Sequence, residues 1–106
     1  MGRASRPKPG RLAGKLTEIR SKLGLSQNEM ISHMGLAGEV TREEISKFER
    51  GVRVPPLPVL LGYGKAAGVY VDALIDDEVE LPQNLPSNSK TEGIRRKAKQ
   101  RKGPTI

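Results

Sequence analysis

Two helix start signals lie close together in the middle of the chain, and they constrain its fold more than any other feature. Ser26 is followed three residues later by Glu29, and Thr41 is followed in the same way by Glu44. This spacing is typical of a capping box, in which the hydroxyl accepts a hydrogen bond from the third N–H of the helix and the carboxylate accepts one from the N–H of the cap residue. The segment therefore predicts two short helices, each beginning at its own cap.

An apolar pair flanks each capping box, at the positions of a hydrophobic staple. Leu25 and Met30 flank the first cap, and Val40 and Ile45 flank the second. Such a pair packs together and fixes the angle at which the chain enters the helix. With a glycine-bearing segment between the two units, the pattern favours a helix-turn-helix over residues 26–51.

Apolar spacing and glycine stops predict three further helices. A stripe of helical period ends at Gly24 and predicts a helix over 11–23, because glycine commonly terminates helices. Helices are also expected over 58–67 and 71–75, each with one apolar face. The residues expected in the core from the last four helices are Met30, Ile31, Met34, Ile45, Phe48, Leu60, Leu61, Tyr63, Ala67, Val71, Leu74 and Ile75.

The charge of the chain is divided unevenly. The net charge is +7, but residues 1–23 and residues 90–106 each carry seven Lys or Arg and one acid. Residues 24–89 carry five bases and ten acids, so the middle of the chain is acidic. Basic arms favour nucleic acid because they neutralise phosphates and release counterions. Solvated tails that only aid solubility have the same composition.

The composition of the ends also divides the chain. Pro, Gly and polar residues dominate both ends, so we expect a disordered basic arm over 1–10 and a disordered basic tail over 83–106. A single domain is then expected over 11–82. Its last part, Asp76–Pro82, is an acidic exit segment.

Several classes of protein are not supported by the residues present. The chain has no Cys, one His, two Tyr, one Phe and no Trp. It shows neither the spacing of a nucleophile and its base nor a phosphate-binding loop with Lys, so we expect no enzyme, metal site or cofactor. No run of about 18 apolar residues is present that would span a membrane. The absence of Cys suits a cytoplasmic location.

Several short motifs follow one another along the chain. They are LGLSQ at 23–27, ISKFERG at 45–51, a Pro-rich link and GVYVDALI at 68–75. Together they resemble the helix-turn-helix domain of the phage Cro/repressor (XRE-like) family, over about residues 12–76. The resemblance implies an all-α, five-helix domain of the lambda-repressor type. It also implies binding to operator DNA as a homodimer, with the helix over 41–50 in the major groove.

The resemblance further implies which side chains contact DNA. The base-reading positions of the family fall on Thr41, Arg42, Glu43 and Lys47, and its phosphate-binding positions fall on Gln27, Arg20 and Arg53. Arginine can donate two hydrogen bonds to guanine, and glutamate can accept one from cytosine, although Glu43 also suits the first turn of any helix. Arg20 and Glu49 match positions that pair across two helices, and we interpret Glu49 as structural rather than catalytic.

We therefore expect a sequence-specific regulator of transcription that binds double-stranded DNA, most simply a repressor. The alternative is an antitoxin-like or other protein-interaction module, in which residues 76–106 fold on a protein partner and the helix-turn-helix serves autoregulation. Two features depart from the family. The connector over 35–40 is longer than usual, and the middle of the chain is acidic. We expect the acids of the exit segment to face away from DNA.

Overall fold

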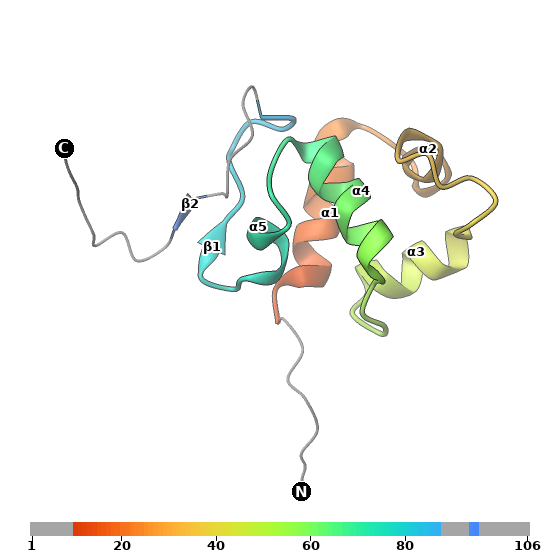
Figure 1. Ribbon diagram of the computed structural model, residues 1–106, viewed down its shortest axis with the longest axis horizontal. Coiled ribbons are helices and arrows are strands. Elements are labelled where there is room, and N and C mark those ends of the chain that lie inside the picture. The colour runs from red at the N-terminus through yellow and green to blue at the C-terminus, as the bar shows by residue number, and fades with distance from the viewer. Residues whose placement is uncertain (1–9, 88–93, 96–106) are drawn as a thin grey trace, which may run out of the picture.

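The computed structural model describes residues 10–87 and 94–95, so residues 1–9 of the arm predicted over 1–10 and the tail residues 88–93 and 96–106 lie outside the described residues. The described chain is mostly helical, as the sequence predicts (Figure 1). The elements in chain order are α1 Leu12–Leu23, α2 Gln27–His33, α3 Arg42–Glu49, α4 Leu57–Ala67, α5 Asp72–Ile75, β1 Val79–Glu80 and β2 Ile94–Arg95. No helix in this part of the chain is long and apolar enough to cross a membrane.

Both predicted capping boxes are present. The N–H of Glu29 donates to Ser26 Oγ at 3.0 Å, and the N–H of Ser26 donates to Glu29 Oε1 at 2.8 Å. At α3 the N–H of Glu44 donates to Thr41 Oγ1 at 3.2 Å, and the N–H of Thr41 donates to Glu44 Oε1 at 2.9 Å. A cap of this kind contributes about 1 kcal/mol. The two boxes therefore fix the residues at which α2 and α3 begin.

The long connection between α2 and α3 is anchored on its inner side. Gly35 and Gly38 take left-handed φ values of 74° and 86°, which favour glycine. Leu36 and Val40 pack against the core, and the N–H of Val40 donates to the carbonyl of Leu36 at 3.2 Å. Residues 37–39, between these two anchors, are exposed and form an outward loop, and α3 packs against both α1 and α2 (Figure 1).

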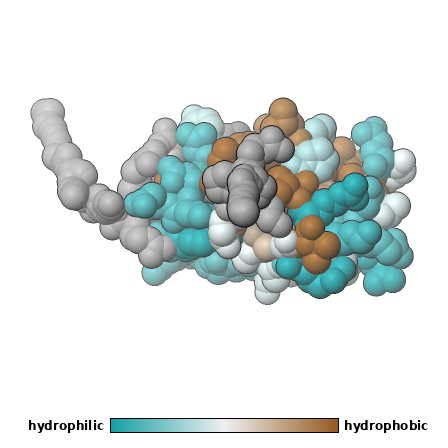
Figure 2. Space-filling view, turned by 90° about the horizontal axis from the view of Figure 1, so that it is seen from below, coloured by the Kyte–Doolittle hydropathy of each residue, from teal (hydrophilic) through white to brown (hydrophobic). Residues whose placement is uncertain are grey.

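The core lies between α1, α4, α5 and the inner faces of α2 and α3. Its fully buried side chains include Leu16, Ile19, Met30, Ile45, Tyr63, Leu74, Val59, Val69 and Val79. Most of the core prediction is confirmed, but it is wrong for Leu61 and Ile75, which are 47% and 43% exposed. Leu61 lies on the outer side of α4, and Ile75 ends a helix of only four residues. Hydrophobic residues gather toward the middle of the face shown in Figure 2.

Two glycines inside α4 allow close packing. A Cβ atom at Gly62 would lie 2.8 Å from Sδ of Met34, and one at Gly64 would lie 3.1 Å from the carbonyl oxygen of Val69. Glycine lowers helix propensity by about 1 kcal/mol relative to alanine. Here it lets α4 approach the end of α2 and lets the chain turn back after α4.

The acidic exit segment forms part of the domain. Val79 is fully buried, and Leu81 is also buried. Asp77 accepts hydrogen bonds from the N–H of Gly10 at 2.8 Å and from the N–H of Arg11 at 3.0 Å. The N-cap residue of α1, Arg11, makes no side-chain capping bond of its own. Asp77, which is far from α1 in the sequence but next to its beginning in the fold, thus supplies the cap that α1 lacks.

We expect Asp77→Asn to make stability less sensitive to acid. The N–H groups of Arg11 and Gly10 lower the pKa of Asp77 from its usual 3.8. A carboxyl whose pKa is lower in the folded protein than in the unfolded chain stabilises the fold above its unfolded-state pKa. This contribution is lost as the pH falls through the folded-state pKa. Thermal unfolding between about pH 7 and pH 2 should therefore show a smaller acid-induced decrease in Tm for Asp77→Asn than for the wild type. Asp72→Asn, which removes another acid nearby, is the control; equal decreases in all three proteins would contradict the capping role.

The strand pair is a feature that the sequence did not predict. β1 pairs with β2 in antiparallel register, with Val79 opposite Arg95. The N–H of Ser87 donates to the carbonyl of Ala67, at the end of α4, at 2.8 Å. The expectation of a disordered tail over 83–106 is therefore wrong for these described residues. The reason is that α4 and β1 offer hydrogen-bonding groups that the polar sequence of the tail does not reveal.

A buried lysine joins α1 to the end of the domain. Lys15 is buried, with only 3% of the residue exposed. Its Nζ donates to the carbonyls of Ala73 at 2.7 Å, Asp76 at 2.9 Å and Val79 at 2.7 Å. These three bonds use all three protons of the ammonium group. Lys15 therefore holds the end of α5 and the beginning of β1 against α1.

Candidate nucleic-acid interface

The outward face of α3 borders two neighbouring hollows, which we call the α3 groove. The first has a volume of about 220 Å³ and is lined by Gln27, Arg42, Glu43, Ser46, Lys47 and Arg50. The second has a volume of about 500 Å³ and is lined by Arg20, Ser26, Gln27, Asn28 and Arg42. Gln27 and Arg42 line both hollows. The groove therefore runs from the beginning of α2 along the exposed side of α3.

The groove is basic although the middle of the chain is acidic. Three of the bases there, Arg42, Lys47 and Arg50, line the groove together with the acid Glu43. Many of the acids instead belong to α5 and the exit segment. Figure 1 places α5 and β1 at the opposite end of the domain from α2 and α3. The acidic composition is thus separated in space from the α3 groove.

The predicted base-reading residues are only partly brought together. Arg42, Glu43 and Lys47 line the groove. Thr41 does not line it, and its hydroxyl is engaged with Glu44 in the capping box. The reason is geometric, because the N-cap side chain turns toward the free N–H groups of its own helix.

Four residues that line the groove were not predicted as site residues from the sequence: Ser26 and Asn28 in the second hollow, and Ser46 and Arg50 in the first. Ser46 and Arg50 line the same hollow as Arg42, and Arg50 Nε donates to Ser46 Oγ at 3.1 Å. The three residues are spaced by four along α3, so they lie on one face of the helix. This spacing was a signal that could have identified Ser46 and Arg50.

The predicted ion pair between Arg20 and Glu49 is present. Arg20 Nε donates to Glu49 Oε2 at 2.9 Å, and Nη2 donates to Oε1 at 2.9 Å. Nη1 donates to the carbonyl of Leu25 at 3.0 Å. The hydrogen bonds with Glu49 raise the pKa of Arg20, which stays charged. Three of its five N–H groups are therefore used inside the domain, which leaves two for a ligand in the groove.

Two further side chains complete a cluster that we call the Glu49 hub, formed by Arg20, Gln27, Glu49 and Tyr63. Gln27 Nε2 donates to Glu49 Oε1 at 3.3 Å, and the hydroxyl of Tyr63 donates to Glu49 Oε2 at 2.9 Å. The Glu49 side chain is only 5% exposed. One carboxylate from α3 thus joins α1, α2 and α4.

Tyr63 was predicted only as a core residue, and its hydrogen bond was missed. Burial, followed by the charge of Glu49, raises the pKa of Tyr63 well above its usual 10.0, so the hydroxyl remains a donor at neutral pH. A buried tyrosine usually finds a partner for its hydroxyl. The sequence does not indicate that this partner is Glu49, because the two residues lie on different helices.

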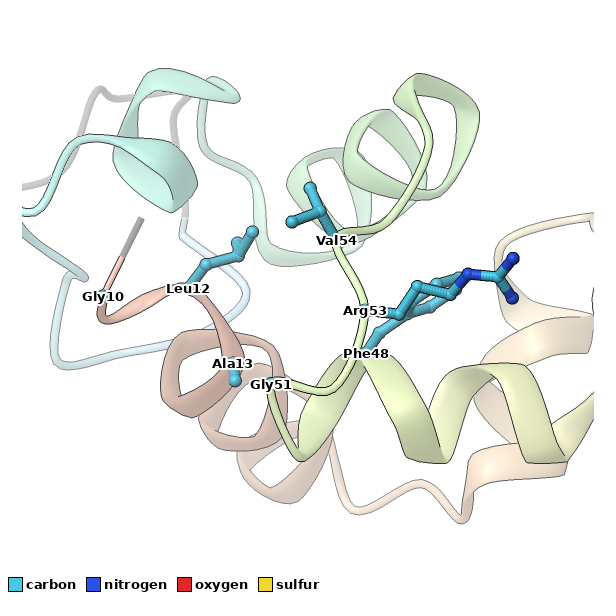
Figure 3. A pocket seen from close by; sticks show the side chains of 7 residues that line it. All are labelled: Gly10, Leu12, Ala13, Phe48, Gly51, Arg53 and Val54. Atoms are coloured by element: carbon cyan, nitrogen blue, oxygen red, sulfur yellow. The ribbon is translucent and has the colours of Figure 1, made fainter. Parts of the chain in front are cut away.

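Arg53 lies outside the α3 groove. It lines a separate hollow of about 380 Å³ with Leu12, Ala13 and Phe48 among its neighbours. Figure 3 shows its side chain extending away from Leu12 and Ala13. The exposed guanidinium is available to an anion, but the structure does not group it with the other predicted phosphate-binding residues.

The groove is suited to an anionic ligand rich in hydrogen-bond acceptors. Within the described part of the chain, no group of three or more His, Cys, Asp or Glu residues could hold a metal ion. Comparisons of the chain with models of protein families, with curated proteins and with solved structures found no match.

Proposed function

We propose that the protein is a sequence-specific DNA-binding regulator of transcription, most simply a repressor. In this proposal α2 and α3 form the helix-turn-helix of a five-helix domain of the Cro/repressor (XRE-like) type, and α3 enters the major groove. The observation that carries it is the basic α3 groove on the exposed side of a capped helix. The opposite side of that helix is buried through Ile45 and Phe48. The major groove of B-DNA is wide enough for one α-helix.

The residues of the groove divide between base reading and phosphate binding. Arg42, at the first turn of α3, donates to the O6 and N7 atoms of guanine, and Glu43 accepts from cytosine N4. Lys47 and Arg50, farther along the helix, bind a base or the neighbouring phosphates. The basic chain ends add attraction that does not depend on sequence and that weakens with salt. A regulator of this kind must be in the same compartment as the DNA that it binds, so the proposal includes a cytoplasmic location.

An exposed apolar surface on α4 supports a homodimer. Leu57, Pro58, Leu60, Leu61 and Val71 line an apolar hollow of about 490 Å³, which we call the α4 patch. Leu57 is 76% exposed. Exposed apolar patches often mark interaction sites. We propose that a second copy of the chain covers the α4 patch, so that two α3 helices face one duplex.

The alternative of a protein-interaction module receives less support. It requires the segment from residue 76 onward to be free to fold on a partner. Asp77 instead caps α1, and Val79 and Leu81 are buried in the domain. The beginning of that segment is therefore already committed within the domain.

Selection of bound sequences from random duplex DNA at near-physiological salt tests both parts of the proposal. We expect an enriched motif made of two inverted half-sites whose centres are about 10 base pairs, or one helical turn, apart. A single unpaired half-site would contradict the homodimer and leave the DNA-reading function standing. The absence of any enriched sequence would contradict the specific regulator itself.

We expect Arg42→Ala to relax the sequence preference at one position of the motif. The loss of a bidentate hydrogen-bonded contact with guanine should weaken binding to the selected site by about 1–3 kcal/mol, with little effect on binding to random DNA. Fluorescence anisotropy with the selected duplex and with its single-base variants measures the change.

Lys65→Ala is the matched control for Arg42→Ala. It also removes one exposed positive charge, but from α4 and outside the α3 groove. It should leave the preference at every position unchanged. If Arg42→Ala weakened binding to all sequences equally, Arg42 would bind phosphate rather than a base.

A further inference from the structure

We propose that Tyr63 is a positioning residue for the α3 groove and acts through Glu49 on Gln27. The inference rests on the proposed DNA-binding function. Tyr63 is fully buried on α4 and does not line the groove. Its only route to the groove within the described contacts is the hydroxyl, which donates to Glu49 Oε2 at 2.9 Å.

The carboxylate of Glu49 distributes its partners between its two oxygens. Oε2 accepts from Tyr63 and from Arg20 Nε, each at 2.9 Å. Oε1 accepts from Arg20 Nη2 at 2.9 Å and from Gln27 Nε2 at 3.3 Å, and Arg20 Nε, which is shared between the two oxygens, also lies 3.1 Å from it. A carboxylate offers about four acceptor positions, two on each oxygen. The Tyr63 hydroxyl and the shorter contact of Arg20 Nε occupy Oε2, so the Gln27 amide bonds to Oε1, where Nε makes only its longer contact.

This arrangement fixes how Gln27 faces the groove. Because a carboxylate only accepts, Gln27 must turn Nε2 toward Glu49, and its side-chain carbonyl then points elsewhere. Gln27 lines both hollows of the groove together with Arg42. The orientation of its amide thus sets part of the hydrogen-bond pattern that the groove presents.

Removal of the Tyr63 hydroxyl would allow the hydrogen bonds to Glu49 to rearrange. It would open an acceptor position on Oε2 in a place that is almost closed to water, since the Glu49 side chain is 5% exposed. Buried acceptors rarely remain unpaired, so Gln27 or Arg20 should shift toward Oε2. The ring of Tyr63 is held by the core and would stay in place. The change would therefore be transmitted to the groove without opening a cavity.

Tyr63→Phe tests the inference through the ratio of specific to non-specific DNA binding. We expect affinity for the selected duplex to fall about fivefold, as for the loss of one hydrogen bond, and affinity for random duplex to stay the same. The dependence of affinity on salt should not change, because no contact between a cation and a phosphate is removed. Glu49→Gln, which replaces one acceptor oxygen by a donor, should lower the same ratio.

Val79→Ala serves as the control for stability alone. Val79 is also fully buried but lies in β1, outside the Glu49 hub. At a temperature at which all the variants are folded, Val79→Ala should keep the wild-type ratio. If Tyr63→Phe also kept that ratio, Tyr63 would be structural only and the inference would be overturned.

NMR of the Gln27 side-chain amide separates this inference from the proposed function. In the absence of DNA, its two N–H resonances should move in Tyr63→Phe and stay in place in Val79→Ala. Unmoved resonances in Tyr63→Phe would overturn the positioning role even if the wild type selects a DNA motif. Moved resonances in a protein that selects no motif would instead count against the proposed function.

Discussion

Glu49→Ala is expected to lower the free energy of unfolding by about 3–5 kcal/mol, the range for breaking a buried ion pair by removing one partner. The substitution leaves Arg20, whose side chain is only 21% exposed, without a counter-ion. It also leaves the hydroxyl of the fully buried Tyr63 without its acceptor. Urea unfolding followed by circular dichroism measures the loss. A decrease below about 1 kcal/mol, the size of one ordinary hydrogen bond, would show that the Glu49 hub does not hold the helices together.

Glu43→Ala provides the matched control for Glu49→Ala. Both residues are glutamates on α3, but Glu43 is exposed and lines the groove. A surface substitution of this kind changes stability by no more than about 0.5 kcal/mol. The pair of variants therefore separates the effect of the hub from the effect of losing a negative charge from α3.

A double-mutant cycle tests whether Arg20 and Glu49 act as one unit. If they do, Arg20→Ala combined with Glu49→Ala should cost clearly less than the sum of the two single losses, because the second substitution removes a group that is already unpaired. Additive losses would mean that each side chain stabilises the fold through other contacts, such as the bond from Arg20 to the carbonyl of Leu25.

The features that the sequence predicts well are those that neighbouring residues decide. A capping box needs only a hydroxyl and a carboxylate three residues apart, so the beginnings of α2 and α3 could be located from the sequence. A helix stop needs only a glycine that can take a left-handed φ, and Gly24 and Gly68 do so at 73° and 74°. In such cases the residues that determine the local structure lie next to one another, so their pattern can be recognised in the sequence.

The features that escaped prediction depend on residues far apart in the chain. Asp77 caps α1, and Tyr63 donates to Glu49, but neither partner can be chosen before the helices are packed. The exposed Leu61 shows the same limit. Its spacing fits an apolar face, but only the position of the other helices determines which face of α4 is covered.

The helices that form the candidate groove were predicted from the sequence, but the residues that line it were predicted only in part. Arg42 and Lys47 were expected from the resemblance and line the groove, whereas Arg53 was expected and lies beside another hollow. Arg53 follows the end of α3, where the chain has turned out of the helix. The prediction that Arg53 binds phosphate stays a prediction, because a contact with the DNA backbone does not require a place in the α3 groove.

Lys15→Met is expected to lower the free energy of unfolding by about 2–4 kcal/mol, although it replaces a buried charge with an apolar side chain. The ammonium group donates to three carbonyls, those of Ala73, Asp76 and Val79. An unpaired buried acceptor costs about 1–3 kcal/mol, and relief from burying the charge offsets part of that cost. Lys22→Met, at an exposed position on the same helix, should change stability by no more than about 0.5 kcal/mol.

The pH dependence of stability gives an independent test of the Lys15 contacts. Burial, followed by the charge of Arg11, lowers the pKa of Lys15 below its usual 10.5. The folded state then binds this proton less tightly than the unfolded chain, so its contribution to stability increases as the pH rises toward 10.5. The difference in unfolding free energy between wild type and Lys15→Met should therefore widen over that interval. A difference that stays constant would mean that the pKa of Lys15 is the same in the folded and unfolded states. A variant as stable as the wild type would mean that the three carbonyls do not need Lys15.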